Sequence, residues 1–508
     1  MKIIKNITEV DYYINDVSIN IPANSFYSIT PTEYGLWIDS DDLIIGLSSG
    51  DLVINDGVND LGIAQGISFI QGNYPDPVGI KGSDGTQIGN IGDRLKTTSN
   101  IEFPSSGLPL NLNLDPGGRL RTSEIHTLGE FSFGNYLDCV GYFSKIETGS
   151  GTVELAENND PSAKLTVSTS NGDVARLGTR RNFEYNKGHP QLIYFTGRFA
   201  EGETNLTQEY GYFDNSHGLF FRDKDDTFYV VRRTSVTGNT VDYEIAQSNW
   251  NVDTLNGSGD TNNPSGLEFD KTKETFYAID FLWLGAFHVR YYIAIGNQAY
   301  LVHTEEYSNK IDVPYMDSGQ AKIQGHIKTT GTISTSKSMY MTCAAVKSEG
   351  KEVHMGRIRN VDTRTTAVSL TTSPSIVAGI RLNSNFTAGS IKPVSFGIMP
   401  ISGNSFVYYQ IIYNATISNA TWVQLDGIAD GLNIVTTTPT YSGGKVLLSG
   451  YLAMGNKNQI STGLNLLIEN DIYIGTDLSD ISEPLIIVMQ GTAGAGDVLF
   501  SGQYREYI

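Results

Sequence analysis

Two carboxylates lie in apolar, strand-like sequence contexts. They are the candidates for the acid–base pair of a polysaccharide-cleaving enzyme. Asp280 lies in "FYAIDFLWL" and Glu244 in "VDYEIAQ". A glycoside hydrolase needs two acids at a defined separation, and a sequence does not give that separation. Because the chain holds 55 Asp and Glu residues, isolated candidates of this kind are expected by chance. A hydrolase acting on surface polysaccharide is therefore kept as an alternative. From the sequence we predict that the protein is not an enzyme, and we assign no catalytic residue.

Metal chemistry has two weak candidates. His288 and His303 flank one predicted hairpin, where two imidazoles on facing strands could share a metal, although ordinary strand positions are the favoured interpretation. The segment "NWNVDTLNGSGD" offers oxygen ligands at Asp253, Asn256 and Asp260, but it lacks EF-hand spacing and the bidentate Glu. A turn built on Asn and Gly is favoured there. No other histidine stands in a zinc-site spacing, so we predict no metal and no cofactor.

Aromatic residues on the predicted strands are candidates for stacking on sugar rings. In adjacent pairs the alternation of a strand sends one ring inward and the other outward. The favoured alternative is that outward rings pack against another subunit or a second sheet. The candidates are Tyr210, Tyr212, Phe213, Tyr291, Tyr292, Tyr408 and Tyr409.

The two cysteines, Cys139 and Cys343, lie in apolar strand-like contexts. Small hydrophobic core residues are the favoured interpretation, and a long-range disulfide between them is left open. Two cysteines are too few for a disulfide-stapled secreted scaffold.

The elements that must position these residues are β-strands. The chain of 508 residues has 54 Gly, 28 Tyr and 21 Phe, a composition typical of strands joined by tight turns. We predict an all-β protein, in which a small mixed N-terminal module precedes two antiparallel β-sandwiches of jelly-roll or lectin-like type. The predicted boundaries are residues 1–75 for the module, 76–125 for a Gly/Pro-rich linker, 126–360 for the central sandwich and 361–508 for the C-terminal sandwich.

The predicted N-terminal module combines strands with two short helices, at Ser40–Gly50 and Ala64–Gly72. A strand over "DLVIND" turns at Asn55–Gly57 toward "DLGI" as its partner. The module carries two lysines against ten acids, a net charge of −8, which suits docking on a basic partner surface.

The whole chain has a formal net charge of −20 and a pI near 4.7. Such a surface repels nucleic-acid backbones and anionic membranes, so we predict contact with neither. No stretch approaches the roughly 20 apolar residues of a membrane span. The first residues carry no secretory signal, so synthesis in a cytoplasm is expected.

The central stretches "HGLFFRDKDDTFYVVRRTSVTG", "QSNWNVDTLNGSG" and "FLWLGAFHVRYYIAIGNQAYLVH" resemble a sandwich domain of virion structural proteins of tailed bacteriophages. The opening "INIPANSFYSIT" and the phrase "DGTQIGNIGDRLKT" are similar to the start of such proteins, so the resemblance spans roughly the first 360 residues. The Trp-Leu-Gly followed by Val-Arg and Ile-Gly-Asn is its most specific part.

The resemblance implies a fibre, spike or decoration protein of head, neck or tail, assembled into a virion in the host cytoplasm. Its partners would be other virion proteins, contacted through residues 1–75, and copies of itself, with a trimer favoured. The alternative function is a receptor- or glycan-binding adhesion protein, with a host surface glycan as the partner.

Overall fold

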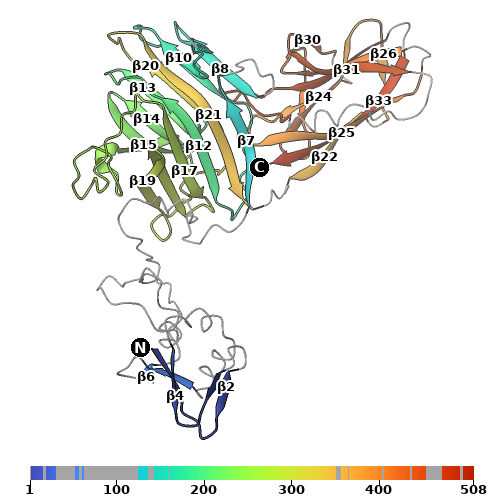
Figure 1. Cartoon of the computed structure of the whole chain (residues 1–508). Coiled ribbons are helices and arrows are strands. Elements are labelled where there is room, and N and C mark those ends of the chain that lie inside the picture. The colour runs from blue at the N-terminus through green and yellow to red at the C-terminus, as the bar shows by residue number, and fades with distance from the viewer. Residues whose placement is uncertain are drawn as a thin grey trace. The chain divides into compact units, whose positions relative to one another are not determined.

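The computed structural model describes residues 2–14, 19–29, 52–55, 60–61, 124–134, 142–157, 159–350, 356–363, 365–402, 406–434, 438–453, 472–491 and 496–507. The chain divides into two compact units, Met1–Phe103 and Pro104–Ile508. Within the described residues the regular elements are strands, apart from one short 3-10 turn at Gln247–Asn249. The predicted all-β class is confirmed (Figure 1).

The first unit contains a four-stranded sheet in the order β4-β1-β5-β6, with strands Phe26–Ile29, Lys2–Asn6, Leu52–Asn55 and Asp60–Leu61. The predicted pairing of "DLVIND" with "DLGI" is confirmed, because Ile54 lies opposite Leu61. A separate hairpin joins β2 (Tyr12–Ile14) and β3 (Ile19–Ile21). Both predicted helices lie outside the described residues, as does the predicted linker except for its last two residues.

The central sandwich has two layers (Figure 1). One is an eight-stranded sheet in the order β19-β18-β17-β12-β21-β10-β9, with β7 also pairing β21: Gln298–Glu306, His288–Ile295, Thr275–Leu282, Gln191–Arg198, Lys337–Glu349, Ala163–Val167, Thr152–Leu155 and Ile125–Ser132. The other is a seven-stranded sheet in the order β16-β15-β14-β13-β20-β11-β8: Val241–Ala246, Thr227–Thr234, Gly218–Lys224, Leu206–Phe213, Lys322–Thr329, Val174–Thr179 and Phe143–Thr148.

Aromatic side chains fill the space between these two sheets. Phe195 stacks on Tyr277 with ring centroids 5.3 Å apart, and Tyr210 lies 4.6 Å from Phe195. The buried hydroxyl of Tyr212 donates to the carbonyls of Phe183 (3.1 Å) or Gly319 (3.0 Å). The apolar faces of both sheets are thereby removed from water, which is the main stabilisation of the sandwich.

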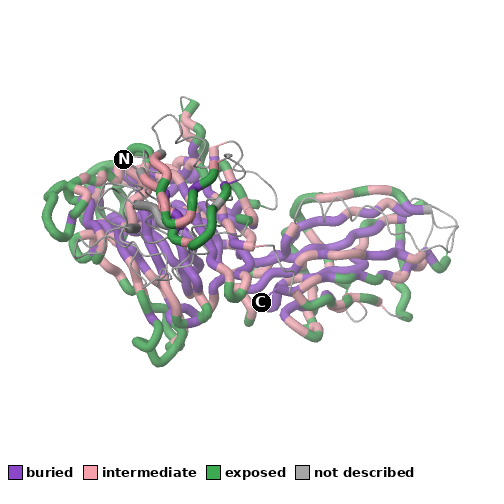
Figure 2. Tube along the Cα trace, turned by 60° about the horizontal axis from the view of Figure 1, so that its bottom comes forward, coloured by how far each residue is buried: buried purple, intermediate pink, exposed green. Residues whose placement is uncertain are grey.

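The C-terminal sandwich packs a four-stranded sheet on a six-stranded one, with a short hairpin beside them. The smaller sheet contains β22 (Arg357–Asp362), β33 (Gly496–Tyr507), β23 (Val368–Leu370) and β25 (Ser390–Pro400). The larger runs β28-β29-β24-β32-β26-β31: Trp422–Gln424, Ala429–Leu432, Ser375–Leu382, Leu485–Gly491, Phe406–Tyr413 and Lys445–Ala453. The hairpin is β27 (Thr416–Ser418) with β30 (Thr440–Ser442). Figure 2 shows the buried strands of both sandwiches.

A segment of the C-terminal half, residues 474–483, lies against the seven-stranded sheet of the central sandwich; we call it the strap. Lys322 on β20 donates to the strap's Thr476 carbonyl (2.8 Å), Thr476 hydroxyl (2.9 Å) and Asp477 carbonyl (2.7 Å). Arg180 forms an ion pair with Glu483 at its other end. The strap therefore joins the two sandwiches into one unit.

Cys343 corrects one prediction. Its side chain is exposed, as a free thiol, on the outer face of the eight-stranded sheet. Its neighbour Ala344 faces the core, because successive residues of a strand point to opposite sides. Cys139 lies outside the described residues. In the described part of the chain, no helix is long and apolar enough to cross a bilayer.

A charged groove on the seven-stranded sheet

A row of charged side chains crosses the outer face of the seven-stranded sheet. Arg176 on β11 lies opposite His326 on β20, His326 opposite Glu209 on β13, and Glu209 opposite Arg222 on β14. The residues that alternate with them, such as Ala175 and Phe221, face the core. The period of two along each strand therefore gathers four ionisable groups on one face.

The next row holds Lys328, Thr207 and Lys224 in the same manner. Together the two rows form part of the wall of an open groove of about 680 Å³. Five cationic and four carboxylate side chains line it, along with five neutral polar ones and the ring of Phe213: Arg176, Arg222, Lys224, Arg233, Lys328, Glu209, Asp225, Asp242, Glu244, His326, Asn215, Thr207, Thr240, Thr330 and Phe213.

An ion-pair network occupies the middle of the groove. Arg222 contacts Glu209, Glu244 and, at 2.6 Å, Asp242. Arg233 donates to Asp242 at 2.8 Å. Burial acts to raise the pKa of Glu209, but the hydrogen bond from His326 and the charges of Arg222 and Arg233 hold that pKa well below its usual value.

Asp242 behaves in the same way. Burial opposes ionisation, but the hydrogen bond and charge of Arg233, with Arg222 beside it, lower the pKa of Asp242. Both carboxylates are therefore ionised at neutral pH, and their charges are matched by guanidinium groups.

His326 is held by the same network. Its Nδ1 lies 3.2 Å from Glu209 Oε2, and its buried Nε2 has no hydrogen-bond partner among the described residues. Burial lowers the pKa of His326 more than the neighbouring Glu209 raises it, so the ring is neutral at pH 7.

Arg176 differs from Arg222. Its hydrogen bonds go to neutral amide oxygens, Gln324 Oε1 at 2.6 Å and Asn215 Oδ1 at 2.9 Å. Burial lowers the pKa of Arg176, although a guanidinium stays charged. Within the described residues, no carboxylate forms an ion pair with Arg176 or with Lys328.

The strap holds the wall beside Arg176. Asn215 donates its Nδ2 to the strap's Leu478 carbonyl (3.1 Å) and to Asp480 (2.7 Å), while its Oδ1 accepts from Arg176. Gly178, two residues along β11, allows the strap to come close, because a Cβ there would lie 2.9 Å from Leu478 Cδ2.

The two carboxylates singled out in the sequence are not brought together. Glu244 lies in the groove. Asp280 is fully buried on β17, in the other sheet, and pairs with Arg290 on β18. They do not form an acid pair.

Six of the seven aromatic candidates are buried and so offer no ring for stacking on a sugar, in line with the favoured interpretation that these rings pack against protein. Phe213 forms part of the groove floor, but the guanidinium of Arg233 covers its ring at 5.5 Å. Tyr408 alone of the seven is half-buried. The buried six are Tyr210, Tyr212, Phe213, Tyr291, Tyr292 and Tyr409.

The weak metal candidates do not assemble. His288 lies opposite Glu306, and His303 lies opposite Tyr291. Asp253 shapes a turn by accepting from Leu255 N (3.0 Å) and Asn263 Nδ2 (2.7 Å). The favoured turn interpretation of this segment is confirmed, and the described residues contain no cluster of three or more metal-ligating groups.

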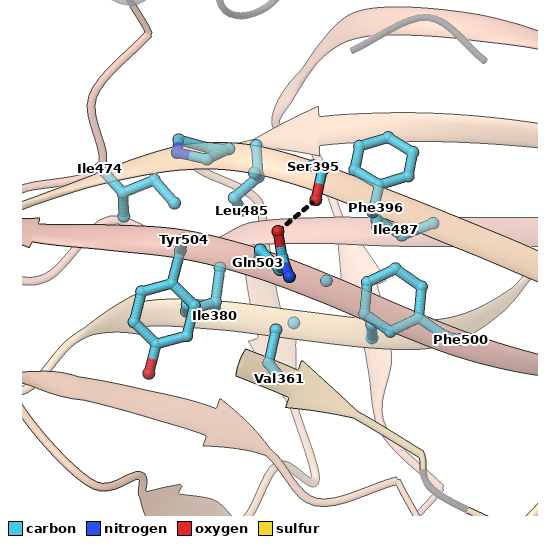
Figure 3. A pocket seen from close by; sticks show the side chains of 14 residues that line it. Val361, Ile380, Ser395, Phe396, Ile474, Leu485, Ile487, Phe500, Gln503 and Tyr504 are labelled. Carbon is cyan, nitrogen blue, oxygen red and sulfur yellow. Dashed lines mark hydrogen bonds between the residues drawn. The ribbon is translucent and has the colours of Figure 1, made fainter. Parts of the chain in front are cut away.

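Another hollow lies inside the C-terminal sandwich, between β33 and β24 (Figure 3). It is lined by apolar side chains such as Val361, Ile380 and Phe500, with a volume of about 40 Å³. Ser395 donates to Gln503 at 3.0 Å beside it. This space is a small packing gap of the core and holds no charged group.

Arg176, Glu209, Arg222, His326 and Lys328 were not identified from the sequence. The usable signal was the alternation of polar with apolar residues in "KIQGHIK", which marks a strand with one polar face. Which strands lie side by side, and hence which charges meet, is not contained in that pattern.

No protein-family model and no curated protein matches the chain. Among solved structures, a β-glucanase of Bacillus licheniformis is 12% identical and aligns over 45% of this chain and 100% of its own, with a TM-score of 0.30. An endo-β-1,4-glucuronan lyase of Trichoderma reesei is 11% identical over 44% and 96%, with a TM-score of 0.30. Peanut lectin is 10% identical over 46% and 100%, with a TM-score of 0.25. At these values the likeness supports no inference about activity.

Proposed function

We propose that this protein binds a glycan in the groove of the seven-stranded sheet. The observation that carries the proposal is the groove itself: an open hollow of about 680 Å³ lined almost wholly by polar and charged side chains. Sugars present many hydroxyls that donate and accept, and fixed planar groups such as guanidinium, carboxylate and amide meet them in pairs. Because strands carry these groups, they are held in place before any ligand arrives.

The electrostatics favour binding over hydrolysis. A general acid for glycoside cleavage needs a carboxyl whose pKa is raised, so that it holds a proton near neutral pH. Glu209 and Asp242 have lowered pKa values, because the hydrogen bond from His326 and the charges of Arg222 and Arg233 outweigh burial. Glu244 is also paired, with Arg222 and Lys224.

An array of purified bacterial surface oligosaccharides tests this proposal. We expect the full-length protein to bind at least one glycan, and Thr330→Trp to weaken that binding tenfold or more, because Thr330 is exposed and lines the groove. Thr261→Trp is the matched control, since Thr261 is equally exposed and lies outside the groove. Absence of any bound glycan, or equal binding by both variants, would contradict the proposal.

We further propose that the groove is carried on the virion of a tailed bacteriophage, as the sequence resemblance implies. Residues 1–75 would attach the protein to another virion component, and copies of the chain would assemble together, with a trimer favoured. The observation in favour is that Met1–Phe103 forms a compact unit of its own, as an attachment module must.

A further inference from the structure

The groove carries an excess of positive charge on a strongly acidic protein. The chain has a net charge of −20, whereas five cationic and four carboxylate side chains line the groove. The excess positive charge is not spread evenly, because the carboxylates gather around Arg222 and Arg233. Arg176 and Lys328, on the neighbouring strands, are left without carboxylate partners in the described structure.

Of these two cations, Arg176 has the better-defined orientation. It is held in a fixed orientation by Gln324 Oε1 at 2.6 Å and Asn215 Oδ1 at 2.9 Å, both neutral acceptors. The charges of Glu209, Asp480 and Asp214 act on Arg176, but none of these carboxylates forms a salt bridge with it in the described structure. An oxyanion that reaches a partly desolvated guanidinium forms charge-assisted hydrogen bonds with it. The structure thus presents an oriented guanidinium whose hydrogen-bond acceptors are neutral.

Lys328 lines the same groove but lies on the other side of His326 from the Arg176 guanidinium, because Arg176 bonds to Gln324, two residues before His326 on β20. Arg176 is directly opposite His326, and Lys328 is two residues beyond His326 on the same strand and face. Such diagonal neighbours have side chains about 7–8 Å apart at their base. The two cations therefore stand on either side of His326, and a sugar unit lying over this ring would have a positive charge on each side. Thr207 lies opposite Lys328 on the other side and adds a hydroxyl.

Arg222, in the same groove, is a cation whose charge is already matched by carboxylates. It contacts three carboxylates from two other strands, Glu209, Asp242 and Glu244, and so has little affinity left for a ligand anion. Arg222 therefore belongs to a structural ion-pair network, whereas Arg176 and Lys328 form no salt bridge in the described structure.

We propose that the Arg176–Lys328 part of the groove selects a sugar unit bearing an oxyanion, either the carboxylate of a uronic acid or a sulfate ester. This inference rests on the proposed glycan-binding function and adds the chemical class of the ligand. The remainder of the groove would take the neighbouring sugar units.

The glycan array gives the first test, when its members are sorted into neutral, uronate-bearing and sulfate-bearing oligosaccharides. We expect the bound glycans to be uronate- or sulfate-bearing, with affinity at least tenfold above neutral oligosaccharides of equal length. Binding confined to neutral glycans, or equal binding of all three groups, overturns this inference while glycan binding itself stands. Binding of none overturns both.

Titration of the strongest bound glycan then identifies the residues. Lys328→Gln and Arg176→Gln should each weaken its binding about tenfold and should weaken binding of the neutral oligosaccharide by a clearly smaller factor. Lys273→Gln removes one charge from an exposed site outside the groove and should change neither affinity. Since Arg176 also supports Asn215, Lys328→Gln decides if Arg176→Gln fails to fold. Unchanged binding by Lys328→Gln overturns the inference.

Discussion

His217 illustrates how a single buried residue ties a turn to the sheet. It lies in the turn between β13 and β14, with its Nδ1 3.3 Å from Asp214 Oδ1 and 3.4 Å from Asp317 Oδ2. Its Nε2 contacts the carbonyl of Gln320. Burial disfavours the charged ring, but the charges of Asp214 and Asp317 outweigh it and raise the pKa of His217 to about 9. The imidazolium is therefore the form present at neutral pH.

The raised pKa of His217 predicts a pH-dependent loss of stability. A folded pKa of about 9 against 6.5 in the unfolded chain contributes stability that is fully present below pH 6.5 and lost as the pH rises through 9. The size is about 3 kcal/mol, at roughly 1.4 kcal/mol for each pKa unit. His217→Gln should remove this dependence, so that the difference in free energy of unfolding between the two proteins narrows between pH 6.5 and 9. Denaturant titrations at four or five pH values measure it, and parallel curves would contradict it.

At the residue scale the sequence shows which positions are charged or apolar, but not on which face of the molecule each side chain lies. Glu244 and Asp280 have the same strand-like context, yet one borders the groove and the other lies buried against Arg290. Cys343 has an apolar context and is exposed. Alternation fixes only that neighbours point to opposite sides; both sides of a central strand can be covered, as Tyr291 and Tyr292 show by being buried together.

At the element scale, local pairings were predictable and distant ones were not. The hairpin of β18 and β19 turns at Gly296-Asn297, and that of β14 and β15 at Asp225-Asp226, as the turn residues indicate. The groove, however, depends on β13 lying beside β20. There Glu209 contacts His326 across 117 positions of sequence. No local sequence signal specifies such a partner. The strands of the site were therefore predicted, but the way they lie side by side was not.

The strap is the element whose attachment rests most clearly on one side chain. Burial lowers the pKa of Lys322 to about 8, so the ammonium is protonated at pH 7 and donates to three strap acceptors. Lys322→Met keeps the aliphatic stem but leaves the Thr476 and Asp477 carbonyls without their donor, at a cost of about 1–3 kcal/mol for each buried acceptor.

We therefore expect Lys322→Met to loosen the strap before it unfolds either sandwich. Amide hydrogen exchange across residues 474–483 should become at least tenfold faster, while exchange in β13 and β20 stays close to that of the unaltered protein. Lys164→Met, on β10 and away from the strap, is the control and should leave exchange in the strap unchanged. Equal protection of the strap in all three proteins would show that other contacts, such as Arg180 with Glu483, suffice to hold it.

At the scale of the whole molecule, the described hydrophobic cores of the second unit are self-contained. The core clusters of the two sandwiches draw on residues from Leu128 to Tyr504 and on none from the first unit. A chain organised in this way can divide its tasks, with recognition on one unit and attachment on the other. The proposed virion setting makes that division testable.

Removal of residues 1–103 is expected to leave a folded, glycan-binding protein that no longer joins the particle. Because Pro104–Ile508 is a compact unit with its own cores, its midpoint of thermal unfolding should stay within a few degrees of that in the full chain. Its affinity on the glycan array should be unchanged, since every residue lining the groove lies beyond position 103. Co-purification with phage particles, measured by immunoblot after complementation, should be lost, because the acidic module that would meet a basic virion surface is missing. A truncated protein still found on particles would place attachment in the sandwiches instead, and a truncated protein that fails to fold would show that the first unit supports the second.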